Sequence, residues 1–192
     1  MKRRRTLIVS LLLVTALCMG IGYAAVSGTL TVKGDVTIKE QPFDVKFTGM
    51  TSVANPDTIT VTDVSNLNSN PSNQATLTVA SLQNKGDTVT VTYTIENFND
   101  VAVDLATPTI TLHGNDSTYT NTNPSKYTVS AKYNGSTDTV SLDAADEGTD
   151  SATLVVTITL TSVYTGTDLN AADETIHEYF TIALQANEHT TP

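Results

Sequence analysis

The sequence predicts an all-β protein, a jelly-roll or Ig-like β-sandwich with a separable N-terminal strand. Threonine and valine dominate the chain in short runs that alternate polar and apolar residues, which is the pattern of strands with one wet face. Asparagine, proline and glycine gather between these runs, where turns are expected. Only Thr167–Ile176 has a helical pattern, and it is long enough for one or two turns. Many short strands separated by turns indicate a sandwich.

The first expected strand lies between Val26 and Ile38, near the start of the chain. Further runs of period two are expected to form strands at Thr58–Thr62, Ala75–Ala80, Val89–Ile95, Thr109–Leu112, Tyr127–Ala131, Leu154–Leu160 and Tyr179–Leu184. In the third of these runs Val89, Val91, Tyr93 and Ile95 share one face, and threonines occupy the other. The dipeptide Asn134-Gly135 predicts a hairpin turn.

Residues 1–24 have the pattern of a secretory signal peptide. Four basic residues at positions 2–5 precede an apolar run from Leu7 to Ile21, and small residues follow. Cleavage is expected between Ala24 and Ala25. The apolar run is shorter than the roughly 20 residues that a spanning helix needs. The sequence thus predicts three parts: a leader over 1–24, an N-terminal arm over 25–40 and a sandwich domain over 41–192.

The composition of the chain limits where the protein is expected to lie and what it is expected to bind. The chain has ten Lys and Arg against twenty Asp and Glu; four of the basic residues lie in the leader, so the mature chain has a net charge of −14. Such a surface does not favour nucleic acid, and contact with a membrane is expected only before cleavage. The single cysteine, Cys18, leaves with the leader. A secreted chain without disulfides is typical of a Gram-positive bacterium, so we expect an extracellular or cell-surface protein.

The arm is the candidate functional segment. Its expected anchors are Ala25 and Val26, which begin the mature chain, and Leu30, Val32, Val36 and Ile38, which share one face of the strand. Burying the last four contributes about 6–12 kcal/mol, whereas ordering about ten residues costs about 10–20 kcal/mol. Main-chain hydrogen bonds must therefore supply the difference, which they do best between two existing strands. The pattern leaves two arrangements open: pairing within the same subunit, or insertion into a neighbour.

The acidic and histidine residues of the sequence do not form a recognised metal or peptidase motif. One loop carries the acidic residues Asp143, Asp146, Glu147 and Asp150, whose hard oxygen donors suit Ca²⁺. Their spacing is not that of an EF-hand, and a solvated acidic loop is the favoured interpretation. The dipeptide His177-Glu178 lacks the second histidine of a zinc-peptidase helix, because position 181 is threonine. We expect no catalytic residues, and calcium is the one cofactor that the sequence leaves open.

Several stretches resemble the TasA/camelysin family of exported bacterial biofilm matrix fibre proteins. The leader end Gly22–Ala25 and the strand Gly28–Val32 are similar to the family's cleavage region and first strand. The segments Leu82–Val89 and Tyr93–Asn97 resemble its strand entry and the turn that follows, and Tyr179–Gln185 fits its closing strand.

The resemblance implies a jelly-roll subunit of an extracellular fibre, processed by a signal peptidase. In such fibres the N-terminal strand of one subunit inserts into the sheet of its neighbour. The expected partners are identical subunits, together with an accessory or anchor subunit. Two alternatives stay open: a secreted metallopeptidase of the camelysin type, and a monomeric Ig-like adhesin or binding module.

Overall fold

The computed structural model describes residues 29–39, 44–113, 126–146, 148–162 and 175–189. These ranges contain eleven strands: β1 Thr29–Lys39, β2 Val45–Asn55, β3 Thr60–Asp63, β4 Gln74–Leu82, β5 Thr88–Asn97, β6 Val103–Leu105, β7 Thr109–His113, β8 Tyr127–Tyr133, β9 Val140–Leu142, β10 Ser151–Leu160 and β11 Thr175–Glu188. Among the described residues no helix is long and apolar enough to cross a membrane. The short helix expected at Thr167–Ile176 lies outside these ranges, except for its last two residues, which begin β11.

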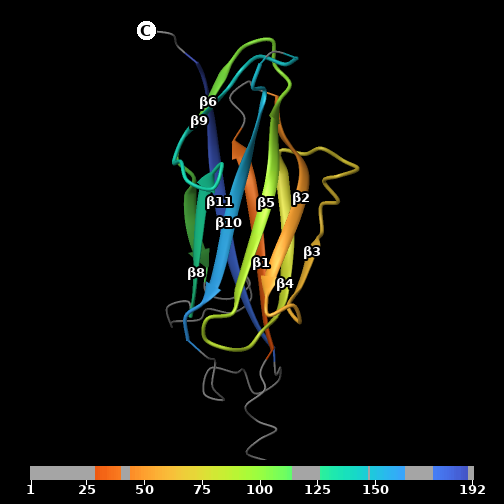
Figure 1. Ribbon diagram of the computed structural model, residues 1–192, viewed down its shortest axis with the longest axis vertical. Coiled ribbons are helices and arrows are strands. Elements are labelled where there is room, and N and C mark those ends of the chain that lie inside the picture. The colour runs from red at the N-terminus through yellow and green to blue at the C-terminus, as the bar shows by residue number, and fades with distance from the viewer. Residues whose placement is uncertain (1–28, 40–43, 114–125, 147, 163–174, 190–192) are drawn as a thin grey trace, which may run out of the picture.

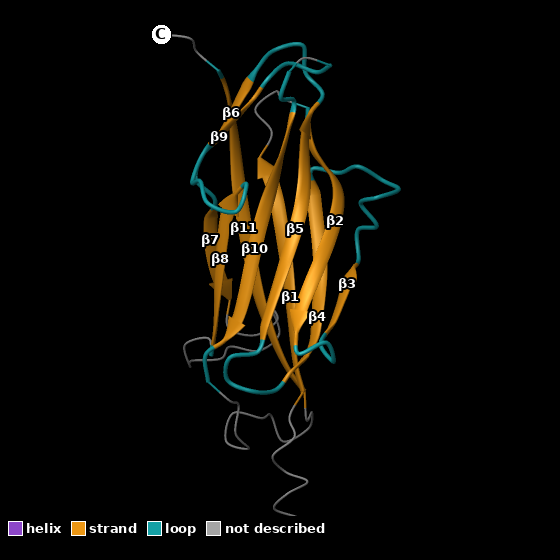
Figure 2. Ribbon diagram, viewed as in Figure 1, coloured by secondary structure: helices purple, strands orange, loops and turns teal. Residues whose placement is uncertain are grey.

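The strands form two sheets that pack face to face, so the predicted all-β sandwich is confirmed (Figure 1). One sheet has seven strands in the order β3-β4-β1-β11-β6-β9, with β7 paired to β11 as well. The other has four strands in the order β2-β5-β10-β8. Figure 2 shows that both sheets run along the long axis of the molecule, with loops at its two ends and along its sides. The pairing of β1 with β11 is parallel, whereas the other strand pairs are antiparallel.

The core lies between the two sheets and is built by period-two alternation. The expected inward face of β5 is confirmed, because Val89, Val91, Tyr93 and Ile95 are all fully buried. The ring of Tyr93 contacts that of Phe47 in β2, with the ring centroids 5.5 Å apart. Alternate residues of β1, β4, β10 and β11 belong to the same core, together with buried residues of β6, β8 and β9. One continuous core therefore joins the first strand to the last.

The hairpin expected at Asn134-Gly135 is only partly correct. The turn forms with positive φ angles of 47° and 77°, and the Ser136 N–H donates to the Tyr133 carbonyl at 3.0 Å. The residues after it make only one isolated bridge, Tyr133↔Thr137, and β8 pairs with β10 instead. The chain leaves β8 through this turn and crosses to the other sheet, where β9 joins β6.

Candidate functional site

The predicted arm forms β1, and β1 lies in the middle of the seven-stranded sheet of its own chain. It pairs in parallel with β11 from Thr29↔Thr175 to Lys39↔Gln185, and antiparallel with β4 from Leu30↔Leu82 to Thr37↔Gln74. Figure 1 shows β1 running between these two strands toward the end of the molecule where the C-terminus lies. In the single chain the strand therefore has the self-paired arrangement, one of the two that the sequence left open. We call the space between β4 and β11 the β1 slot.

The inward face of β1 agrees with the expected anchors where the structure describes it. Val32 and Val36 are 0% exposed and Ile38 is 1% exposed, and all three join the common core. Leu30 belongs to the strand through its backbone, although its side chain is outside the described set. The positions Ala24, Ala25 and Val26, which include the expected cleavage site, also lie outside it. Three buried aliphatic side chains thus tie this strand to the core.

Gly34 occupies the fourth inward position of β1 and has a close neighbour. It stands opposite Phe180 of β11 and opposite Leu77 of β4. A Cβ built on Gly34 would lie 2.2 Å from the Cζ atom of Phe180, and Phe180 itself is fully buried. The phenyl ring therefore occupies the space that a side chain at position 34 would need. Sequence reasoning allowed for a close approach at this glycine, but only the structure identifies the ring.

The outward face of β1 adds polar contacts to the same slot. The hydroxyl of Thr76 in β4 donates to the carboxylate of Asp35 at 2.8 Å. At the end of the strand the Ile38 N–H donates to the Asn73 carbonyl at 2.9 Å. The side-chain contact and the main-chain hydrogen bond thus hold β1 beside β4 at two points along the strand.

The acidic loop proposed for calcium is only partly described, because Glu147 lies outside the described ranges. The carboxylate of Asp143 accepts a hydrogen bond from the Thr149 N–H at 2.6 Å. Asp146 is exposed, with a φ of +63°, and the backbone carbonyl of Asp150 accepts the Asn97 N–H at 2.9 Å. Within the part of the chain that the structure describes, no three acidic, histidine or cysteine side chains gather as metal ligands do. Calcium binding by this loop stays a prediction.

The histidines lie on strands or at a strand end. His177-Glu178 belongs to β11 and His113 ends β7, so neither stands on a helix. His189 places its Nδ1 atom 2.9 Å from the carboxylate of Asp104, which also accepts the hydroxyl of Ser141 at 2.5 Å. The hydrogen bond from Ser141, followed by the contact with His189, lowers the pKa of Asp104 below its ordinary value.

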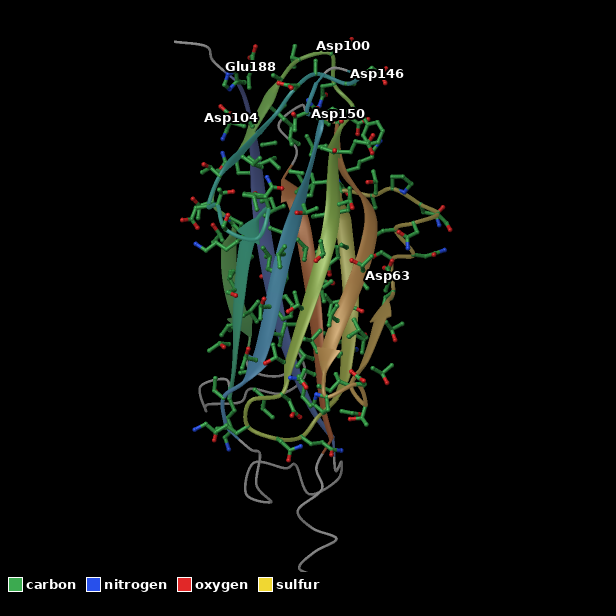
Figure 3. The ribbon with its side chains drawn as sticks, in the orientation of Figure 1. Asp63, Asp100, Asp104, Asp146, Asp150 and Glu188 are labelled. Carbon is green, nitrogen blue, oxygen red and sulfur yellow. The ribbon has the colours of Figure 1, made fainter. Side chains whose placement is uncertain are left out.

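This three-residue contact was not found from the sequence, because its members are far apart along the chain. Asp104 lies in β6 and Ser141 in β9, and His189 follows β11. The carboxylate of Asp104 contacts both the hydroxyl of Ser141 and the imidazole of His189. The imidazole is therefore placed to bind the carboxylate and not to take a proton from the hydroxyl. The arrangement joins β6, β9 and the residue after β11 at the upper end of the molecule, where Figure 3 labels Asp104. It is not the geometry of an activated nucleophile.

Comparison with known proteins gives no family. No family model matches the chain, and no curated protein matches it. Among solved structures the mu-homology domain of yeast delta-COP-I aligns over 83% of this chain and 96% of its own, at 9% identity and a TM-score of 0.16. So low a TM-score carries no argument about fold or function.

Proposed function

We propose that the chain is a secreted structural subunit that polymerises by N-terminal donor-strand exchange into extracellular fibres of a biofilm matrix. The observation that carries this proposal is the position of β1. The first strand of the predicted mature chain fills a central slot, with a neighbour along each edge. A strand that comes first in the chain and lies in the middle of a sheet is the element that two copies can exchange with least rearrangement elsewhere.

An empty β1 slot would be unstable, so some strand has to fill it. Without β1, both β4 and β11 would have unpaired edges, and the core would lose Val32, Val36 and Ile38. Exposed edges of this kind recruit other strands. A β1 strand from a second copy would restore each backbone pair and each buried side chain. Exchange therefore costs little in contacts, as in domain swapping.

The resemblance to the TasA/camelysin family supports the same proposal independently of the structure. In that family the donated strand becomes available after export. The predicted leader of this chain would couple the two events, because the first strand is held at the membrane until cleavage between Ala24 and Ala25. If β1 enters the slot of a second copy before it fills the slot of its own chain, assembly takes place outside the cell.

A cysteine experiment distinguishes exchange from self-pairing. The expected mature chain has no cysteine, and Asp35 and Thr76 touch through their side chains across β1 and β4. Chains with Asp35→Cys are mixed with chains with Thr76→Cys under assembly conditions and then oxidised. Directly opposed positions in an antiparallel pair are close enough for a disulfide. We expect a covalent dimer on a non-reducing gel, since each disulfide must join two copies.

The control is Val53→Cys, which places the thiol at a position of β2 that is 73% exposed and remote from the β1 slot. Mixed with Asp35→Cys chains, it should give only the background of random oxidation. The double variant Asp35→Cys/Thr76→Cys should give a ladder in fibres. Cross-linking confined to single chains, or normal fibres from a chain that lacks residues 25–38, would contradict the proposal.

A further inference from the structure

We propose that Gly34 and Phe180 form a register key that determines which extended segment fits the β1 slot and at what position. The segment that fits has apolar residues at alternate positions, a glycine opposite Phe180, and a direction parallel to β11. In the closed chain this segment is β1 itself. The extension to a second copy as donor rests on the proposed function, whereas the key itself does not.

The key follows from the distances around Gly34. An added Cβ would lie 2.2 Å from Cζ of Phe180, 2.6 Å from Cε1 and 2.7 Å from Cε2. These three distances are far shorter than ordinary carbon contacts of about 3.5–4.0 Å. The ring is fully buried and belongs to the packed core, so it has little room to move aside.

Hydrophobic pattern alone does not determine this register. A slip of one residue is excluded, because it would turn the inward residues of β1 out to solvent. A slip of two residues keeps the same face inward, and Val32, Val36 and Ile38 are all aliphatic. Such a slip would place Val32 or Val36 against the Phe180 ring, where even one carbon does not fit. The glycine therefore excludes the slips that the alternation permits.

The first test is a cycle of variants, measured on the monomeric fraction of the mature chain: Gly34→Ala, Phe180→Ala and both together. Overpacking a core costs about 1–3 kcal/mol, so we expect Gly34→Ala to lower Tm by about 2–12 °C. Phe180→Ala leaves a cavity and also lowers Tm. On that background the added methyl group has room, so we expect Gly34→Ala to have little further effect. If Gly34→Ala alone does not fold, the double variant should still fold as Phe180→Ala does.

The second test moves the glycine. The variant Val32→Gly/Gly34→Val has the same composition and the same alternation, but its glycine comes two residues earlier. If the key sets the register, β1 shifts by two residues, and position 33 takes the place of Asp35 opposite Thr76. Cysteines at positions 33 and 76 should then form a disulfide in this variant, whereas cysteines at 35 and 76 should do so in the parent chain.

Two results would overturn the key. One is equal loss of Tm from Gly34→Ala with and without Phe180. The other is an unchanged 35–76 disulfide and Tm in the chain with the moved glycine. Both tests use closed monomers, so a confirmed key without fibres would contradict the proposed function and leave the key intact.

Discussion

Val36→Ala tests how strongly the first strand is held in its slot. Val36 is 0% exposed and stands between Ala75 of β4 and Ile182 of β11. The substitution removes two carbons from the core, about 0.8 kcal/mol each by transfer, and the cavity adds to this. We expect the free energy of unfolding to fall by about 2–3 kcal/mol, and Tm by about 4–12 °C.

The assay is urea unfolding of the mature monomer, with Val53→Ala as the matched control. The same two carbons are removed there from a side chain that is 73% exposed, so the change should stay within about 0.5 kcal/mol. Equal effects at the two positions would refute the reasoning, because they would mean that β1 contributes no more to the core than a surface residue does.

Two further predictions concern polar groups. The hydroxyl of Tyr93 is buried without a partner among the described residues, so Tyr93→Phe should raise the free energy of unfolding by about 1 kcal/mol. Tyr133→Phe loses a 3.0 Å hydrogen bond to the Ala106 carbonyl and should lower the free energy of unfolding by about 1 kcal/mol. A fall for both variants in urea unfolding would contradict this. The pKa of Asp104 is lowered in the folded state. The ionised carboxylate therefore stabilises the fold above its ordinary pKa of 3.8, and this stabilisation is lost as the pH falls through the pKa of the folded state. Asp104→Asn should therefore make Tm less sensitive to acid as the pH falls below 3.8, and an unchanged slope would refute the assignment.

The fold could be predicted because local chemistry determines most of it. Runs such as Val89–Ile95 alternate cleanly, since one face enters the core and the other meets solvent. β2 was missed because its alternation stops after Phe47, where the register shifts and the rest of the strand is mostly exposed. β6 and β9 have three residues each and owe their strand structure to pairing with each other and with β11. Tertiary context, and not their own sequence, makes them strands.

The candidate site was predictable in its inward face and not in its location. Val32, Val36 and Ile38 repeat every second or fourth residue, so their common face follows from strand geometry. Which strands flank them depends on contacts with Leu77 and Phe180, far along the chain, and no local pattern records such contacts. The alternation also reads the same whether the slot belongs to the same copy or to another, so it does not distinguish self-pairing from exchange.

Chain length places a limit on how two copies can exchange β1. The strand ends at Lys39, and the backbone is fixed again at Asp44, whose carbonyl accepts the Phe98 N–H at 2.9 Å. Five residues span at most about 18 Å. A strand donated in the observed register therefore brings the corresponding ends of donor and acceptor close together. Two copies that exchange β1 reciprocally give a closed dimer. In a fibre, the corresponding ends of successive copies have to lie close together along the fibre axis.

The ends brought together in this way are acidic. Figure 3 shows Asp100, Asp104, Asp146, Asp150 and Glu188 at this end of the molecule. Like charges on neighbouring copies repel over a screening length of about 8 Å at physiological ionic strength and about 30 Å at 0.01 M. Exchange should therefore be slow in low salt and faster in 0.15 M salt, as measured by the rate of the mixed 35–76 disulfide. A rate independent of salt would mean that the acidic ends do not meet, and that β1 is not donated in the register of the closed chain.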